Sequence, residues 1–289
     1  MKKLLTVLAI ALLFLPLVGK GLASRTVRIK TAAGTLKMKV LRPREDMGPV
    51  PGILWIHGGG YMTGGSYMVH VSGGKMLAER YGAVVVSPAY RLAGKAPYPA
   101  ALEDCYAALE WMYEKADELG IDRTRIVVGG ESAGGGLTAA VCLYARDKGM
   151  IPIALQLPIY PMLDCEDTES SADNHGKIWN TRKNHMGWKH YLGELYGTDD
   201  VPSYASPARE TDYSGLPPCY TYVLDGEPFY AETLTYVKNL QAAGVDAKVD
   251  VYHGDVHAFD GLLFWQEQSK QAKRRLCEEY ERIIVKRDE

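Results

Sequence analysis

The stretch that decides the fold is Arg125-Ile126-Val127-Val128-Gly129-Gly130-Glu131-Ser132-Ala133-Gly134-Gly135-Gly136. It begins as a β-branched run typical of a buried strand, breaks at glycines around one serine, and continues as a small-residue helix over Leu137–Arg146. Glycines two positions before and two after Ser132 fit a tight strand-to-helix turn, the nucleophile elbow. Such a turn lifts the serine hydroxyl above the sheet, and the N-terminus of the following helix favours negative charge there. The pattern is common, so the rest of the chain decides whether Ser132 is a nucleophile.

The composition suits one sizeable hydrophobic core. The chain has 289 residues, 47% hydrophobic and 24% charged, with a formal net charge of −2. An α/β fold of this length commonly forms one domain, and the near-neutral charge gives no indication of nucleic acid as a partner. The cysteines are odd in number and dispersed, so we predict buried free thiols. They are Cys105, Cys142, Cys165, Cys219 and Cys277.

The first 24 residues differ from the rest of the chain. Two lysines precede an apolar run over 4–18, and small residues precede Ser24, a layout typical of a secretory signal peptide. We therefore predict export to the periplasm or the extracellular medium, with 25–289 as the mature domain. The alternative is membrane attachment through 4–18, a run slightly short for a full span. Dispersed free cysteines are more typical of a reducing compartment, which argues against export.

Strands and helices alternate along the chain. Besides the elbow strand and its helix, we expect strands over 26–31, 35–41, 52–56, 83–87, 153–160, 220–224 and 248–252, and helices over 72–80, 99–119, 230–243 and 264–284. The first two strands flank Ala33-Gly34 and are predicted to form a β-hairpin. The remainder predicts a mostly parallel central sheet with helices on both faces.

One segment interrupts the alternation between 163 and 214. A long insertion between two strands of an α/β sheet commonly forms a lid over the C-terminal strand ends, so we predict a small helical lid there. Its aromatic residues either line a pocket or pack the lid onto the body; they are Trp179, Trp188, Tyr191 and Tyr196. We predict that Trp188 of the lid and Tyr61 of the body contact the substrate.

A serine nucleophile needs a general base and an orienting acid. His257 lies in a glycine-containing loop after the last expected strand, where an α/β enzyme places its base, and His253 is its local rival. Asp225 and Glu227 both follow the preceding strand. The chain order serine, acid, histidine is that of the α/β-hydrolases, but position alone does not choose between the two carboxylates.

A glycine motif supplies candidate donors for an oxyanion. His57-Gly58-Gly59-Gly60-Tyr61 follows an expected strand, and its glycines let backbone N–H groups approach a developing negative charge. The amide of Ala133 would supply a further donor. The lysine and hydroxyl of a phosphate-binding loop are missing, and neither metal-ligand spacing nor a dinucleotide fingerprint is present. We therefore expect no metal and no cofactor, and a bracing role for His57.

Together these motifs resemble the hormone-sensitive-lipase-like branch of the α/β-hydrolases, the bacterial carboxylesterases. The glycine motif, the elbow, and Tyr90-Arg91-Leu92-Ala93 leading to Tyr98-Pro99-Ala100-Ala101-Leu102-Glu103-Asp104 all match that branch. The family's acid precedes proline and an apolar residue, which implies Glu227 rather than Asp225. The family's His-Gly-Phe is His257-Ala258-Phe259 here, a small departure. Many relatives carry a helical cap before the first strand, so the first 24 residues could alternatively form such a cap.

The resemblance implies a serine carboxylesterase that hydrolyses small-molecule esters of short-chain acyl groups, acetyl among them. Ser132 would attack the ester, His257 would move the proton and Glu227 would orient the imidazole. Two amides among Gly58, Gly59 and Gly60 would hold the oxyanion together with Ala133, and the family favours Gly59 and Gly60. The alternatives are an amidase or peptidase on the same scaffold and a non-catalytic ligand-binding receptor. Such receptors usually lose a member of the triad.

Overall fold

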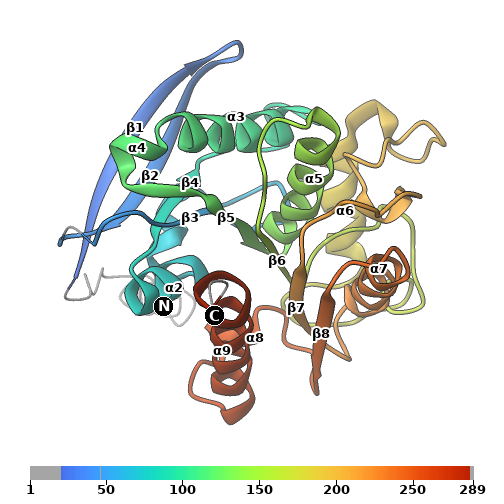
Figure 1. The fold of residues 1–289 in the computed structure, drawn as a ribbon. Coiled ribbons are helices and arrows are strands. Elements are labelled where there is room, and N and C mark those ends of the chain that lie inside the picture. The colour runs from blue at the N-terminus through green and yellow to red at the C-terminus, as the bar shows by residue number, and fades with distance from the viewer. Residues whose placement is uncertain (1–20, 46, 287–289) are drawn as a thin grey trace, which may run out of the picture.

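The central sheet has the strand order β1-β2-β4-β3-β5-β6-β7-β8 in a computed structural model that describes residues 21–45 and 47–286. The strands are β1 (Leu22–Thr31), β2 (Gly34–Pro43), β3 (Val50–Ile56), β4 (Val84–Pro88), β5 (Ile121–Glu131), β6 (Leu155–Ile159), β7 (Cys219–Leu224) and β8 (Ala247–Tyr252). β2 pairs antiparallel with β1 and β4, and the other neighbours are parallel (Figure 1). The predicted mostly parallel sheet is confirmed.

Helices cover both faces of this sheet. They are α2 (Gly73–Tyr81), α3 (Ala100–Glu114), α4 (Ala116–Leu119), α5 (Ala133–Lys148), α6 (Thr181–Leu192), α7 (Tyr230–Ala242), α8 (Phe259–Leu262) and α9 (Glu267–Tyr280). Short 3₁₀ helices are η1 (Ser66–Val71), η2 (Gly193–Leu195) and η3 (Pro207–Arg209), and η4 (Glu281–Val285) is a π-helix. Figure 1 shows α3 and α5 on one side of the sheet and α2 and α9 on the other. Two clusters of buried side chains fill these two interfaces. The architecture is therefore the predicted α/β fold.

The central strands owe their continuous apolar runs to this double covering. Every residue of β3, β4, β6 and β7 is buried, as expected of parallel strands between two helical layers. The edge strand β1 is instead mostly half-buried or exposed, and its hairpin with β2 extends past the helices in Figure 1. The five cysteines are free thiols, and four of them are buried.

The N-terminal strand begins earlier than the sequence indicated. β1 starts at Leu22, which is 5% exposed and pairs with Pro43 of β2, so the strand includes residues assigned above to the leader. The apolar run over 4–18 lies outside the described residues. Within the described ranges, no helix combines the length and the apolar character needed to cross a bilayer.

Two helices differ from their expected bounds. The helix expected over 99–119 is divided at Lys115 into α3 and α4. The last helix begins at Glu267 rather than at Phe264, after the four-residue α8. Phe264 and Trp265 are both more than half exposed, so they do not belong to the buried stripe that packs α9 onto the sheet. The apolar character of these residues made the helix look longer than it is.

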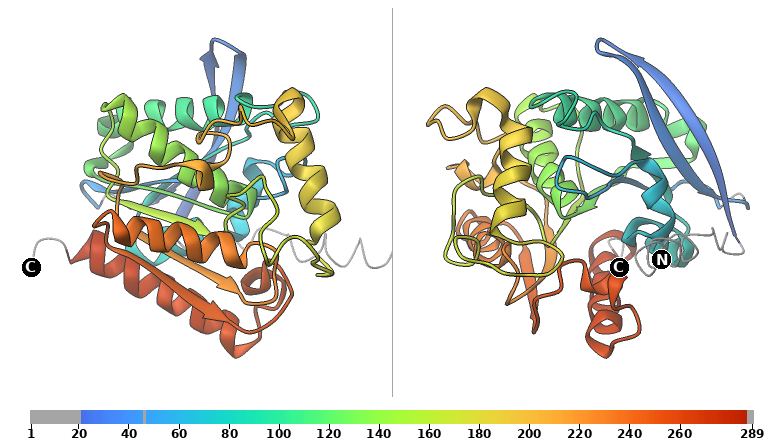
Figure 2. Two further views of the ribbon diagram at one scale, coloured as in Figure 1. Left: turned by 90° about the vertical axis from the view of Figure 1, so that its right-hand side faces the viewer. Right: turned by 180° about the vertical axis from the view of Figure 1, so that it is seen from behind.

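The insertion between β6 and β7 contains α6, η2 and η3. Figure 2 shows α6 beyond the C-terminal ends of β7 and β8. Asn180 begins the helix, because its side chain accepts a hydrogen bond from the Lys183 N–H, as an N-cap residue does. We call this segment, residues 163–214, the lid, and it lies at the edge of the sheet where parallel strands place functional loops.

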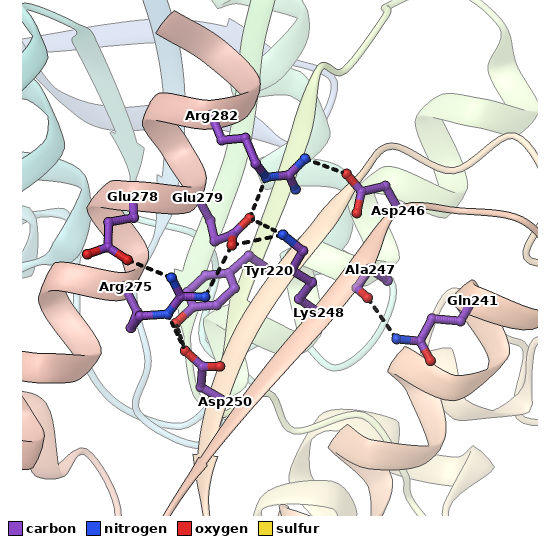
Figure 3. Close-up of polar contacts among 10 residues, drawn as sticks. All are labelled: Tyr220, Gln241, Asp246, Ala247, Lys248, Asp250, Arg275, Glu278, Glu279 and Arg282. Carbon is purple, nitrogen blue, oxygen red and sulfur yellow. Dashed lines mark hydrogen bonds and ion pairs between the residues drawn. The ribbon is translucent and has the colours of Figure 1, made fainter. Parts of the chain in front are cut away.

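A network of charges fixes α9 to the edge strand β8 (Figure 3). Glu279 of α9 is 4% exposed and accepts hydrogen bonds from Lys248 at 3.0 Å and Arg282 at 2.7 Å. Arg275 bridges Glu279 at 3.2 Å and Asp250 of β8 at 3.1 Å. The loop that carries His257 runs from β8 to α8 just ahead of α9, so this network anchors the elements on either side of it.

Candidate active site

The turn between β5 and α5 holds Ser132 in a strained conformation. Its φ and ψ are 60° and −121°, a region that side chains rarely adopt. A Cβ at Gly130 would lie 2.5 Å from the Ile56 carbonyl oxygen, and a Cβ at Gly134 would overlap the same oxygen. Glycine is therefore required on both sides of Ser132, because the turn lies directly against the end of β3.

The structure brings Ser132, His257 and Glu227 into one hydrogen-bonded line. His257 Nε2 lies 2.8 Å from Ser132 Oγ, and His257 Nδ1 contacts Glu227 Oε2. The three residues are 7%, 4% and 0% exposed, respectively. The Glu227 carboxylate is held from the other side, since its Oε1 accepts the N–H of Leu224 at 2.9 Å. With the imidazole proton on Nδ1, Nε2 is free to accept the serine proton.

Asp225, the alternative acid, faces a different histidine. One of its carboxylate oxygens lies 2.9 Å from His253 Nδ1, and the other accepts the N–H of Gly254 at 3.0 Å. The hydrogen bond from His253 lowers the pKa of Asp225 and raises the pKa of His253. His253 is almost fully exposed. Asp225 and His253 therefore form a surface pair outside the line of buried groups.

The glycine loop passes directly over the serine. A Cβ at Gly58 would lie 3.2 Å from Ser132 Cβ, so a side chain there would press on the nucleophile. Gly59 and Gly60 have φ of 117° and 59°, in the region that favours glycine. Among the described residues, the N–H groups of Gly59 and Gly60 donate to no protein acceptor. These amides, with that of Ala133 at the start of α5, are available to an oxyanion.

His57 braces this loop from below. It is 1% exposed, and its Nδ1 donates to the Gly58 carbonyl at 2.8 Å. Its ring stacks on Tyr90 at 4.1 Å between centroids, and the Tyr90 hydroxyl donates to the His57 carbonyl at 3.1 Å. Burial lowers the pKa of His57 to about 4, so the side chain is neutral at physiological pH. The expected bracing role agrees with these contacts.

Tyr61 and Trp188, which we expected at the substrate, are buried in packing contacts. Each is 1% exposed. The Tyr61 ring stacks on Tyr191 at 3.9 Å, and its hydroxyl donates to the Met162 carbonyl at 3.3 Å. Trp188 lies 5.5 Å from Tyr61 between ring centroids. The inner face of α6 thus packs on the loop that follows the glycine motif, and neither side chain offers its surface to a bound molecule.

Another lid residue, Trp179, reaches the glycine loop instead. A Cβ at Gly60 would overlap its indole ring, so the ring packs directly on the Gly60 backbone. Trp179 is partly exposed. The sequence placed it among the lid aromatics, and the signal that sets it apart from Trp188 is its position just before α6.

A second group that sequence reasoning missed lies below His257. Asp260, in α8, is 8% exposed and accepts hydrogen bonds from Tyr160 at 2.8 Å and Tyr222 at 2.9 Å, one on each oxygen. The Tyr160 ring lies 5.0 Å from the His257 ring in an edge-on arrangement. The segment that carries His257 is therefore tied to the ends of β6 and β7. The position of Asp260 three residues after His257 was the available signal.

Glu131, next to the nucleophile, has an unusual environment. Its Oε1 accepts the N–H of Gly73 at 3.2 Å. Desolvation, followed by the nearby Asp260 carboxylate, raises the pKa of Glu131 to about 8. The residue is therefore mostly protonated at neutral pH, and it adds little negative charge beside Ser132. Within the described residues, no cluster of His, Cys, Asp or Glu could hold a metal ion.

Comparisons with known proteins identify the family of this chain. A family model described as the alpha/beta hydrolase fold matches residues 53–261. Esterase LipI of Mycobacterium tuberculosis is 35% identical over 79% of this chain and 72% of its own, and an ethyl acetate hydrolase of Pseudomonas putida is 29% identical over 78% and 71%. Among solved structures, a bacterial heroin esterase superposes with a TM-score of 0.91 at 33% identity, covering 96% of this chain and 90% of its own. The chain thus belongs to the α/β-hydrolase family, in its hormone-sensitive-lipase-like branch.

Proposed function

We propose that this protein is a serine carboxylesterase whose catalytic residues are Ser132, His257 and Glu227. The observation that carries the proposal is the buried line of three side chains beneath a glycine loop with free amides. An α/β-hydrolase fold can carry other chemistry, so the proposal rests on the site rather than on the fold. The similarity to proteins named as esterases supports the same reaction class.

The geometry suits nucleophilic attack on an ester. Ser132 Oγ attacks the carbonyl carbon while His257 Nε2 takes the hydroxyl proton. Glu227 accepts the hydrogen bond from Nδ1–H, so it fixes the imidazole tautomer and stabilises the imidazolium. The protonated His257 then delivers the proton to the leaving alcohol oxygen as the ester C–O bond breaks. The product of this half-reaction is an acyl group on Ser132 and a free alcohol.

The oxyanion is the charge that most needs stabilising. Removal of one backbone or side-chain donor from such a site typically costs 10²–10³-fold in kcat in well-studied enzymes. We assign this role to the amides of Gly59, Gly60 and Ala133, with Gly58 as the residue that brings the loop close to the serine. Water then attacks the acyl group by the same route, with His257 as base, and releases the carboxylic acid. No step requires a metal or an organic cofactor.

We propose short-chain esters, acetyl esters among them, as the substrate class. The name of the ethyl acetate hydrolase to which the chain is similar supports a small acyl group. The indole that closes on the glycine loop supports it as well, because it limits space beside the reacting carbonyl. Nucleic acid has no part in this proposal.

The test is hydrolysis of a chromogenic short-chain ester together with labelling of Ser132 by an organophosphate. We expect turnover, stoichiometric labelling at Ser132, and loss of both in Ser132→Ala. Glu227→Ala should lower kcat by several orders of magnitude, whereas Asp225→Ala, the matched control, should leave it within a few-fold. Absence of turnover and of labelling in the folded wild-type protein would refute the esterase proposal, and a larger loss in Asp225→Ala would refute the choice of acid. A matched amide substrate tests the amidase alternative.

A further inference from the structure

Two contacts connect the nucleophile to the lid through the glycine loop. Gly58 lies over Ser132, since a Cβ there would be 3.2 Å from Ser132 Cβ. Two residues later, Gly60 is in contact with the indole of Trp179, since a Cβ there would overlap the ring. The loop therefore contacts the nucleophile through Gly58 and a lid side chain through Gly60.

Two further contacts connect the same indole to the general base. The rings of Trp179 and Phe229 are 6.4 Å apart between centroids. Phe229 in turn lies edge-on to His257 at 5.1 Å, and His257 Nε2 lies 2.8 Å from Ser132 Oγ. The contacts thus form a closed ring that runs from Ser132 through the glycine loop, Trp179, Phe229 and His257 back to Ser132. The indole therefore lies against the candidate oxyanion loop and, through Phe229, near the general base.

The lid holds the indole in one orientation. Trp179 Nε1–H donates to Asn184 Oδ1 at 3.3 Å, and Asn184 is 1% exposed. A Cβ at Gly187 would lie 3.3 Å from both Trp179 Cζ2 and the Gly60 carbonyl oxygen, so α6 leaves little room for the ring to move. Phe229 is completely buried, whereas Trp179 keeps part of its surface exposed. Within this ring, the indole is therefore the large side chain that can contact a substrate.

We propose that Trp179 forms a wall of the substrate cleft and limits the size of the ester group that lies beside the oxyanion loop. This inference rests on the proposed esterase function. Trp179 is a specificity-determining residue, because it touches the substrate without touching the reacting proton. Its rigid indole admits small groups and excludes bulky or branched ones, so the natural substrates are esters that are compact on that side.

The experiment compares wild type with Trp179→Ala and Trp179→Phe on two substrate series. One series varies the acyl group from acetate to hexanoate with a constant nitrophenyl alcohol, and the other varies the alcohol from ethyl to naphthyl with a constant acetyl group. In at least one series, Trp179→Ala should raise the ratio of kcat/KM for the bulkiest ester to that for the smallest by roughly tenfold or more, since pocket size alone discriminates by about 10–200-fold. Trp179→Phe should fall between.

A purely structural role for Trp179 would lower kcat/KM for all substrates by a common factor and leave these ratios unchanged. Ile178→Ala is the matched control, because Ile178 is the preceding residue and is 40% exposed; its ratios should equal those of wild type. If Trp179→Ala does not fold, as judged by its thermal transition, Trp179→Phe and Trp179→Leu carry the comparison. Unchanged ratios in variants that fold and are labelled by the organophosphate would overturn this inference and leave the proposed esterase function standing. Wild-type protein that is neither active nor labelled overturns the proposed function, and this inference with it.

Discussion

The free energy of unfolding should fall as pH rises because Glu131 ionises, and replacement of Glu131 by glutamine should remove this decrease. The Glu131 carboxyl accepts the N–H of Gly73 and is raised to a pKa of about 8, from its ordinary value of 4.5, by desolvation and by Asp260. Glutamine keeps the acceptor oxygen and the shape of the side chain but cannot ionise. The variant therefore isolates the cost of ionising this one group.

The magnitude follows from the two pKa values. Between about pH 4.5 and 8 the folded protein binds more protons at Glu131 than the unfolded chain does, so the free energy of unfolding falls as pH rises. The slope approaches ~1.4 kcal/mol per pH unit. From pH 5.5 to pH 7.5 the wild type should therefore lose about 2.5 kcal/mol through this group, and Glu131→Gln should not. Above pH 8 the difference between the two proteins should level off.

The assay is equilibrium urea unfolding of both proteins at several pH values from 5.5 to 8.5. The quantity compared is the difference in unfolding free energy between variant and wild type, because it cancels the titration of all other groups. Glu169→Gln, at an exposed position, is the control and should follow the wild type at every pH. If the curves for Glu131→Gln and wild type remain parallel, Glu131 is ionised in the folded protein and the reasoning is refuted.

Four further variants test three buried carboxyl groups. Glu279→Gln should cost about 1–3 kcal/mol at pH 7, because it leaves three cations facing a neutral amide. Despite desolvation, the hydrogen bonds from Arg282 and Lys248 lower the pKa of Glu279, so urea unfolding should show this difference shrinking as pH falls below about 4.5; equal losses at pH 7 and pH 3.5 would contradict it. Glu232→Gln should leave the unfolding free energy nearly unchanged in the same assay, because burial raises the pKa of Glu232 far above its ordinary value. Glu232→Ala should instead cost about 1–3 kcal/mol, because it leaves the Leu163 N–H without its acceptor. Asp260→Asn should lower kcat roughly tenfold with little change in KM, by loosening the segment that carries His257; an unchanged kcat in the folded variant would show that the tyrosine contacts do not position the base.

The elbow was predictable because its cause is local. Gly130 and Gly134 flank Ser132 within five residues, and the turn that they permit is short enough for the sequence to specify. The parallel sheet was predictable for a related reason, since strands covered on both faces become continuous apolar runs. In both cases the information lies within one element and its immediate neighbours.

The choice between Asp225 and Glu227 could not be made from their positions, because both follow β7. The structure separates them through the backbone. Glu227 Oε1 accepts the N–H of Leu224, which turns the carboxylate back over the end of the strand toward His257. Asp225 points to the exposed His253 instead. In the sequence, only the family resemblance favoured Glu227. The structure supplies the reason, because the turn before Pro228 lets the Glu227 carboxylate reach the Leu224 N–H.

The roles of the lid aromatics show where reasoning from composition failed. Trp188, Tyr191 and Leu192 are spaced as i, i+3 and i+4 on α6, the pattern of a buried helical stripe. That spacing, which the prediction for Trp188 did not use, is typical of packing against the body, and the three side chains are 1–3% exposed. Trp179 precedes the helix and belongs to no stripe, so it is free to project elsewhere. An aromatic residue just outside a helical stripe was the better candidate for a pocket wall.

The charges around the nucleophile form an arrangement that no single segment encodes. Asp260 is bound by Tyr160 and Tyr222, which are 100 and 38 residues away in sequence, and its charge helps to keep Glu131 protonated. The buried Asp260 carboxylate therefore opposes ionisation of Glu131, the residue next to Ser132. If Asp260 contributes to this shift, Asp260→Asn should lower the pKa of Glu131. The difference in unfolding free energy between the Asp260→Asn, Glu131→Gln double variant and the Asp260→Asn single variant should then level off at a lower pH than the difference between Glu131→Gln and wild type. The double-variant cycle thus measures the coupling directly, and an unchanged levelling point would assign the raised pKa to desolvation alone.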